Sequence, residues 1–228
     1  MIIIGNNKGF TLIEVLIAMA ISSIVMLSIY TLFMMQIKIK RTQSQTIEVQ
    51  QNIRSAMYLL ERDIRMAGFA GNAVNITAGI DSGFTAATAT GMTFTYVSDE
   101  NAGTLTTIQY ALFDDDADGR TDDLGRAVDG GAPSAIADNI EEIEFYYSTI
   151  DNAGVKAQTT IPPDPSFIKS VQISLLARSQ KLTQIKTPRQ YTPPSGLVIW
   201  GESGAYNDGF YRRYTTSIIT CRNLVSND

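Results

Sequence analysis

The chain has 228 residues, 44% of them hydrophobic, and a net charge of −5 at pH 7. This length suits one folded domain with an appendage. Histidine is absent, which excludes Ser-His-Asp and Cys-His catalysis and the usual His-containing zinc sites. The single cysteine, Cys221, excludes an intramolecular disulfide. Because no basic block is present either, we expect a protein that is not an enzyme and does not bind nucleic acid directly.

A long apolar segment follows the first eight residues. It begins GFTLIEVLIAMAISSIVMLSIYTLF at residue 9, and as a helix of about 1.5 Å rise per residue it spans a bilayer core of about 30 Å. In a secretory signal the small-residue cleavage site follows the apolar core, whereas here Gly9 precedes it. Cleavage after Gly9 therefore leaves the apolar helix on the mature protein.

One carboxylate, Glu14, lies near the start of this segment. A charged side chain at the centre of a membrane helix costs roughly 2.5–3.5 kcal/mol on insertion scales. The basic residues around the segment do not settle its orientation. Lys8 stands before the segment, and Lys38, Lys40 and Arg41 follow it, a count that favours a cytoplasmic C-terminal side without deciding it. By composition alone the segment is a single-pass anchor.

The helix is predicted to continue as far as Gly68. Apolar residues recur at spacings of four and three, at Ile53, Met57, Leu60, Ile64 and Ala67, which is typical of an amphipathic helix. We therefore predict an apolar first half, residues 10–39, and an amphipathic second half, residues 40–68, which lies on a globular domain.

The rest of the chain, residues 69–228, is predicted to be β-rich. Six segments have the alternation or β-branched composition of strands: residues 92–97, 106–113, 140–148, 168–178, 196–200 and 214–224. Loops rich in Pro and Gly separate them. The predicted class is α+β, with a long N-terminal helix packed on a mainly antiparallel sheet domain.

An acidic loop, DDDADGRTDD at residues 114–123, is the most chemically pointed stretch. Its spacing resembles an EF-hand as far as the ninth position, and hard cations prefer such oxygen clusters. The twelfth position is a glycine, which offers no side-chain ligand. The candidate calcium ligands are Asp114, Asp116, Asp118, Asp122 and Asp123. The alternative is a solvated Asp/Gly turn between two strands.

Three other features have ordinary structural explanations. Trp200, Tyr206, Phe210, Tyr211 and Tyr214 offer a sticky surface, but such residues more often pack in a core or a loop. Arg212 and Arg213 form a basic pair that we expect to be solvated. Cys221, within a strand pattern, is expected to be a small buried hydrophobe.

The N-terminal residues carry a family resemblance. Gly9-Phe10-Thr11-Leu12-Ile13-Glu14-Val15 resembles the prepilin processing motif of type IV pilins and type II secretion pseudopilins. The resemblance implies that residues 1–9 are a leader, that a prepilin peptidase cuts after Gly9, and that Phe10 is N-methylated. It also implies that residues 69–228 lie in the periplasm, against the charge count, and that Glu14 pairs with the Phe10 ammonium of a neighbouring subunit in a filament.

Looser patterns resemble PilW-type minor pilins. They are residues 51–69, the acidic turn before Leu124-Gly125-Arg126, and residues 136–147, 171–179 and 211–224. The J-type minor pseudopilin of type II secretion has a similar plan. The resemblance implies a minor pilin that primes filament growth at or near the tip, with no required cofactor. Its partners would be other minor pilins, the major pilin, the inner-membrane assembly platform and the peptidase.

Three alternatives remain open from the sequence. The first is a minor pseudopilin at the tip of a secretion pseudopilus. The second is a membrane-anchored, calcium-dependent adhesin that uses residues 114–123 and the aromatic loops. The third, ranked last, is a carboxylate-based periplasmic enzyme.

Overall fold

The computed structural model describes residues 9–70, 83–99, 104–117, 119–182, 190–201 and 206–224. The expected leader before Gly9 and the candidate ligand Asp118 lie outside these ranges. The chain divides into two compact units, Met1–Ser44 and Gln45–Asp228. Helix α1 (Leu12–Met66) supplies residues to both units.

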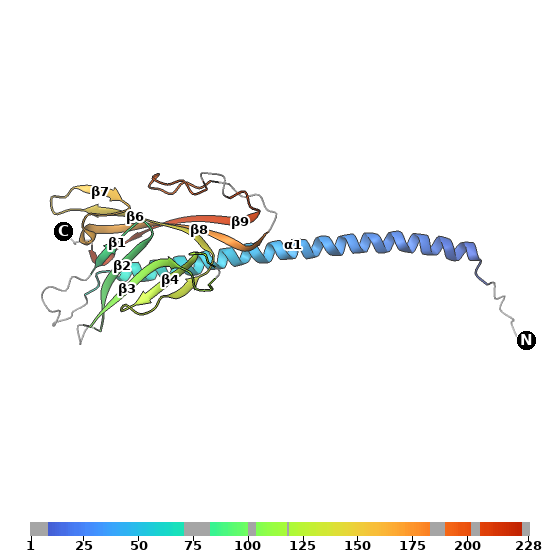
Figure 1. Ribbon diagram of the computed structural model, residues 1–228, viewed down its shortest axis with the longest axis horizontal. Coiled ribbons are helices and arrows are strands. Elements are labelled where there is room, and N and C mark those ends of the chain that lie inside the picture. The colour runs from blue at the N-terminus through green and yellow to red at the C-terminus, as the bar shows by residue number, and fades with distance from the viewer. Residues whose placement is uncertain are drawn as a thin grey trace, which may run out of the picture. The chain divides into compact units, whose positions relative to one another are not determined.

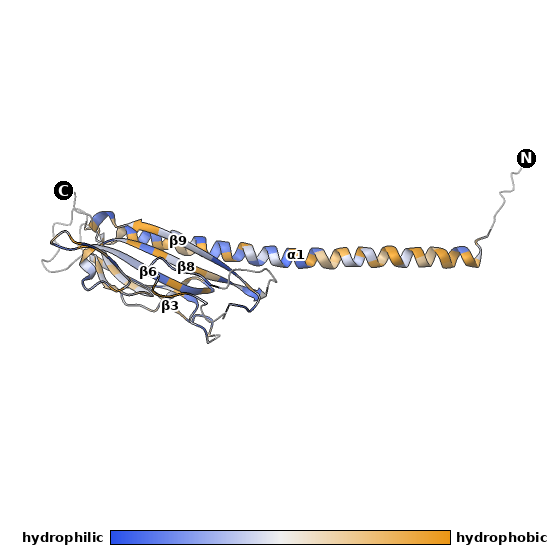
Figure 2. Ribbon diagram, turned by 90° about the horizontal axis from the view of Figure 1, so that it is seen from above, coloured by the Kyte–Doolittle hydropathy of each residue, from blue (hydrophilic) through white to orange (hydrophobic). Residues whose placement is uncertain are grey.

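The part of α1 in the first unit is apolar and exposed. All side chains of residues 9–36 are exposed, and this end of the helix is coloured hydrophobic almost throughout in Figure 2. Three of its hydroxyl groups are satisfied within the helix, since Ser23, Ser28 and Thr31 donate to the carbonyls of Ala20, Ile24 and Leu27. The helix is long and apolar enough to cross a membrane.

The part of α1 in the second unit buries one face. Val49, Ile53, Ala56, Leu60 and Ile64 are at most 6% exposed, as their spacing of about one helical turn predicts. Helix α1 ends at Met66. Gly68 follows with a φ of 75°, a left-handed conformation that glycine adopts without steric cost.

Two antiparallel sheets complete the second unit (Figure 1). The first has the order β1-β2-β3-β4-β5, with the strands Phe84–Ala87, Gly91–Asp99, Thr104–Phe113, Asp123–Val128 and Ser134–Ala137. The second has the order β7-β6-β8-β9, with β6 at Ile140–Ile150, β7 at Lys156–Thr159, β8 at Ile168–Leu182 and β9 at Phe210–Thr220. Short 3-10 turns follow β7 (Pro165–Phe167) and β9 (Arg222–Leu224).

One hydrophobic core joins the helix to both sheets. Leu60 and Ile64 of α1 share it with Phe94 of β2, Phe145 of β6 and Ile173 of β8, all fully buried. Along β8 the core residues Val171, Ile173, Leu175 and Ala177 occupy alternate positions, as the period of two in a strand requires. The predicted α+β class, with a long helix on antiparallel sheets, is confirmed.

The strand predictions were wrong in several places. Residues 196–200 form no strand: Gly196 closes a turn with Pro193, and only Trp200 pairs, in an isolated bridge with Tyr191. The last strand begins at Phe210 and ends at Thr220, earlier than expected. Strands β1, β4, β5 and β7 were missed because they have only four to six residues each, too few to show a period.

A buried polar network ties α1 to the first sheet. Asp63 is 5% exposed, and its Oδ2 accepts hydrogen bonds from Tyr110 Oη at 2.8 Å and from Arg126 Nε at 2.6 Å. Arg62 donates to the other carboxylate oxygen at 3.0 Å. Burial and the Asp63 charge raise the pKa of Tyr110, so the phenol stays a donor.

Asp63→Asn should lower the free energy of unfolding of the globular unit by about 2–4 kcal/mol, because Arg126 loses its counter-ion and the Tyr110 hydroxyl loses a charged acceptor. Thermal unfolding of the full chain in micelles measures the change. Glu61→Gln, which removes the partly exposed Arg65 ion pair, is the control and should cost less than about 1 kcal/mol. Equal effects of the two variants would contradict the role given to Asp63.

Candidate functional site

The site begins where the apolar helix begins, at Gly9 and Phe10. Both residues are exposed, and the Phe10 side chain is 90% exposed. A Cβ atom built on Gly9 would meet nothing within 4 Å. Packing against the described part of the chain therefore does not require glycine at this position.

Glu14 caps the first turn of α1. Its Oε2 accepts hydrogen bonds from the Thr11 backbone N–H at 2.8 Å and from the Thr11 hydroxyl at 2.9 Å. The Thr11 Oγ1 in turn accepts from the Glu14 N–H at 3.3 Å. This reciprocal arrangement is a capping box, which satisfies two amides that the helix itself leaves without partners.

The capping box gives Glu14 a role that the sequence reasoning missed. The signal was present, because Thr11 and Glu14 have the Thr-x-x-Glu spacing of the motif. In hydrocarbon an unpaired amide costs several kcal/mol. The carboxylate therefore offsets part of its own desolvation by satisfying the start of the helix, before any neighbouring subunit is considered.

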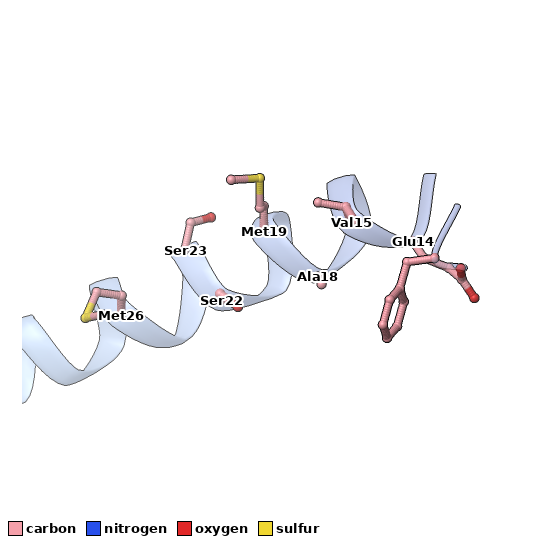
Figure 3. Close-up of a pocket in the computed structure, with 8 residues that line it drawn as sticks. Glu14, Val15, Ala18, Met19, Ser22, Ser23 and Met26 are labelled. Atoms are coloured by element: carbon pink, nitrogen blue, oxygen red, sulfur yellow. The ribbon is translucent and has the colours of Figure 1, made fainter. Parts of the chain in front are cut away.

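One face of α1 next to Glu14 has a shallow groove that is lined by both large and small side chains. Figure 3 shows the labelled side chains along this face, and the groove is lined by Phe10, Glu14, Val15, Ala18, Met19, Ser22, Ser23 and Met26. Glu14, Ala18 and Ser22 follow one another at intervals of four residues, so they lie on one stripe. Small residues at this spacing let a second helix approach closely in an apolar environment.

The structure brings three of the acidic-loop residues together. Asp114, Asp116 and Asp123 each place an oxygen within 4.8 Å of the others. Asp114 also accepts from Gly119 N–H at 3.1 Å, and Asp123 from Asp115 N–H at 3.0 Å. Burial raises the pKa of Asp123.

Asp122 is separated from this group, contrary to expectation. Its carboxylate binds the guanidinium of Arg178 at 2.6 Å, and both side chains are buried. Asp122 directly precedes β4, and its carboxylate binds Arg178 instead of joining Asp123. The calcium site stays a prediction, now with three candidate carboxylates among the described residues.

The C-terminal aromatic residues pack against one another. Arg212 was expected to be solvated, but it is buried. Trp200 and Tyr206 are nearly buried with Leu176 against Tyr191 and Tyr214 on the outer face of the second sheet. Arg212 is 3% exposed and binds Glu141 and Asp208, at 2.5 Å and 2.7 Å. Its guanidinium also lies over the Tyr206 ring. The segment that contains Asp208 is therefore held on the sheet by charge pairs, which the local sequence pattern did not reveal.

Cys221 is fully buried, as predicted. Burial raises its pKa to about 12, so the thiol is inert at neutral pH.

Comparison with known proteins places a family motif on the helix start. Residues 4–30 match the family model described as the prokaryotic N-terminal methylation motif. In structure the chain is similar to a type IV-like pilin from Thermus thermophilus, with a TM-score of 0.44 and 14% sequence identity, covering 77% of this chain and 98% of that one. The search of curated proteins found no match. The prepilin-type methylation motif predicted from the sequence is therefore present.

The calcium prediction has a direct thermal test. Calcium bound by Asp114, Asp116 and Asp123 relieves their repulsion, so the full chain in micelles should gain about 2.7 kcal/mol of stability at a calcium concentration of 100 times Kd. Asp116→Asn should abolish the gain. Asp122→Asn should lower the stability without calcium but keep the gain. A wild-type chain whose unfolding temperature is the same with calcium and with chelator would contradict the prediction.

Proposed function

We propose that this chain is a PilW-type minor pilin that helps to start type IV pilus filaments and lies at or near the filament tip. The observation that carries the proposal is the methylation motif over residues 4–30, at the start of a helix whose side chains are all exposed as far as residue 36. An apolar helix of this kind needs either lipid or other helices around it.

The apolar helix allows the subunit to lie in either of two apolar environments. In the first, the helix anchors the chain in the inner membrane, with residues 69–228 in the periplasm. In the second, the helix lies among the helices of other subunits in a filament. Both environments are apolar, so the apolar surface of the helix stays out of water when the subunit moves from the membrane to the filament. The free-energy difference between the two is therefore small, and a motor can drive the movement in either direction.

Glu14 marks the difference between these states. In the single chain its partner is the Thr11 cap. After cleavage at Gly9, the new ammonium of Phe10 on a neighbouring subunit offers a full charge, and a paired buried charge costs much less than an isolated one. The proposed pairing fixes the axial register of one subunit on the next. The small residues Ala18 and Ser22 on the same stripe allow the close approach that the pairing requires.

The partners follow from the same proposal. A prepilin peptidase processes the Gly9–Phe10 junction and methylates Phe10, and other minor pilins and the major pilin contact the helix and the globular unit. The inner-membrane assembly platform moves the subunit. No cofactor takes part in these steps.

Surface pili, counted by electron microscopy, test the role in assembly. A strain without this gene should have few pili or none, and the wild-type gene should restore them. Glu14→Ala and Glu14→Gln should both fail to restore them. Gln can take the third position of a capping box but carries no charge, so this variant separates the charge pair from the helix cap.

Membrane insertion is the control for both variants, and it should be unchanged because the apolar segment remains. Normal piliation with Glu14→Gln would contradict the charge pairing. Unchanged pili in the strain without the gene, together with loss of secreted proteins, would instead support a pseudopilin of type II secretion.

A further inference from the structure

Among the described residues the two sheets end in four edge strands, and three of these strands are protected. Strands β1, β5 and β7 have four residues each. Pro133 directly precedes β5, and Lys156 begins β7. Short length, proline and lysine are the usual means by which proteins prevent a sheet edge from pairing with another chain. Strand β9 is different, because its edge runs for eleven residues.

The sequence of β9 does not protect this edge. Residues 214–220, YTTSIIT, contain no charge, proline or glycine. Nearly all of them are β-branched or aromatic, which favours extended backbone. Ile218 is 66% exposed at the edge. Such a segment is a ready template for an added strand.

The register shows which backbone groups point away from the sheet. Cys221 N–H donates to Lys169 O at 2.9 Å, and Tyr211 N–H donates to Ser179 Oγ at 3.0 Å. Odd-numbered residues of β9 therefore face β8, since pairs alternate along an antiparallel ladder. The N–H and C=O groups of Tyr214, Thr216, Ile218 and Thr220 face outward. None of these eight groups has a hydrogen-bond partner in the described part of the chain.

Two exposed arginines flank the edge, although the whole chain has a net charge of −5. Strand β9 runs beside α1, because Ser217 Oγ donates to Glu61 at 3.1 Å and Asn223 Nδ2 donates to Arg65 O at 3.0 Å. Arg213 and Arg222 are exposed near the two ends of residues 214–220, whereas Arg65 pairs with Glu61 of its own helix at 3.5 Å. A second copy of β9 paired antiparallel would bring Arg213 near Arg222 at both ends. An acidic strand would not meet this repulsion.

We propose that the β9 edge accepts an extended strand from a different protein, with uncharged residues at its centre and acidic residues at its ends. Main-chain hydrogen bonds to the outward groups of residues 214–220 supply affinity, and the flanking arginines select the acidic partner. The added strand extends the second sheet to five strands. This interaction does not require the pilin role proposed above, since it depends only on the globular unit.

A short peptide in which Val and Thr alternate between Asp residues is the probe. The full chain in detergent micelles should bind it, and amide exchange at Tyr214, Thr216, Ile218 and Thr220 should slow, because their N–H groups become hydrogen-bonded. The same peptide with alternate backbone amides N-methylated should not bind. A version with Lys in place of Asp should bind at least about tenfold more weakly.

Two variants locate the site on the protein. Ile218→Lys places a charge on the edge and should weaken binding by about tenfold or more. Ile161→Lys is the matched control, because Ile161 is 65% exposed, against 66% for Ile218, and lies in the loop after β7 rather than on β9. It should leave binding unchanged. Thr216→Pro removes one outward N–H and no ladder bond, and it should also weaken binding.

Several results would overturn the proposal. Equal binding of the N-methylated peptide would show that main-chain pairing is not involved. Equal binding by Ile218→Lys would move the site elsewhere. Peptide-independent protection of residues 214–220 that depends on protein concentration would show that the occupant is a second copy of this chain.

Discussion

The exposed apolar surface of α1 is the constraint on which the rest of this protein depends. Burying one Leu, Ile or Phe side chain is worth about 1.5–3 kcal/mol, and residues 9–36 carry many such side chains that the described part of the chain leaves exposed. No plausible stability of the globular unit compensates for leaving that surface in water. The segment therefore belongs in lipid or among other helices.

The details of this helix are consistent with an environment without water. No Gly or Pro interrupts α1 between Leu12 and Met66. The hydroxyls of Ser23, Ser28 and Thr31 donate their hydrogen bonds to backbone carbonyls of the same helix. The first turn is closed by the capping box of Thr11 and Glu14. Each of these features removes a polar group that hydrocarbon would leave unsatisfied.

The globular unit must hold a helix and two sheets together, and buried polar contacts add to its hydrophobic core. Asp63 connects α1 to Tyr110 and Arg126 of the first sheet. On the outer face of the second sheet, Glu144 is buried beneath a loop and accepts from Ser195 Oγ at 2.5 Å. These buried carboxylates are paired, and pairing is the condition under which such groups are tolerated. They fix where the helix and the loop sit within this unit.

The sequence predicted the features that repeat and missed those that depend on tertiary contact. The helix, its buried stripe and the long strands β2, β3, β6 and β8 have clear periods, and they were predicted close to their observed bounds. The apolar residues 196–200 have strand composition but lie in a loop, because a turn at Gly196 and the anchor of Ser195 on Glu144 decide their path. Composition does not encode such contacts.

The same distinction applies to the candidate site. Gly9, Phe10 and Glu14 were found from a local motif whose spacing is complete in the sequence. Asp122 and Arg212 were misjudged because their partners, Arg178 and Glu141, are 56 and 71 residues away. A charge that looks solvated in one dimension can be half of a buried pair in three.

The N-terminus of the mature protein tests the central claim most directly. Mass spectrometry of the chain purified from membranes should show a protein that starts at Phe10 and carries one methyl group on its α-amine. Gly9→Ala or deletion of the prepilin peptidase should give the full precursor, starting at residue 1 and unmethylated. A wild-type chain that keeps residues 1–9, or is cut after the apolar segment, would contradict the account, because no ammonium would then exist at Phe10 for Glu14 to bind.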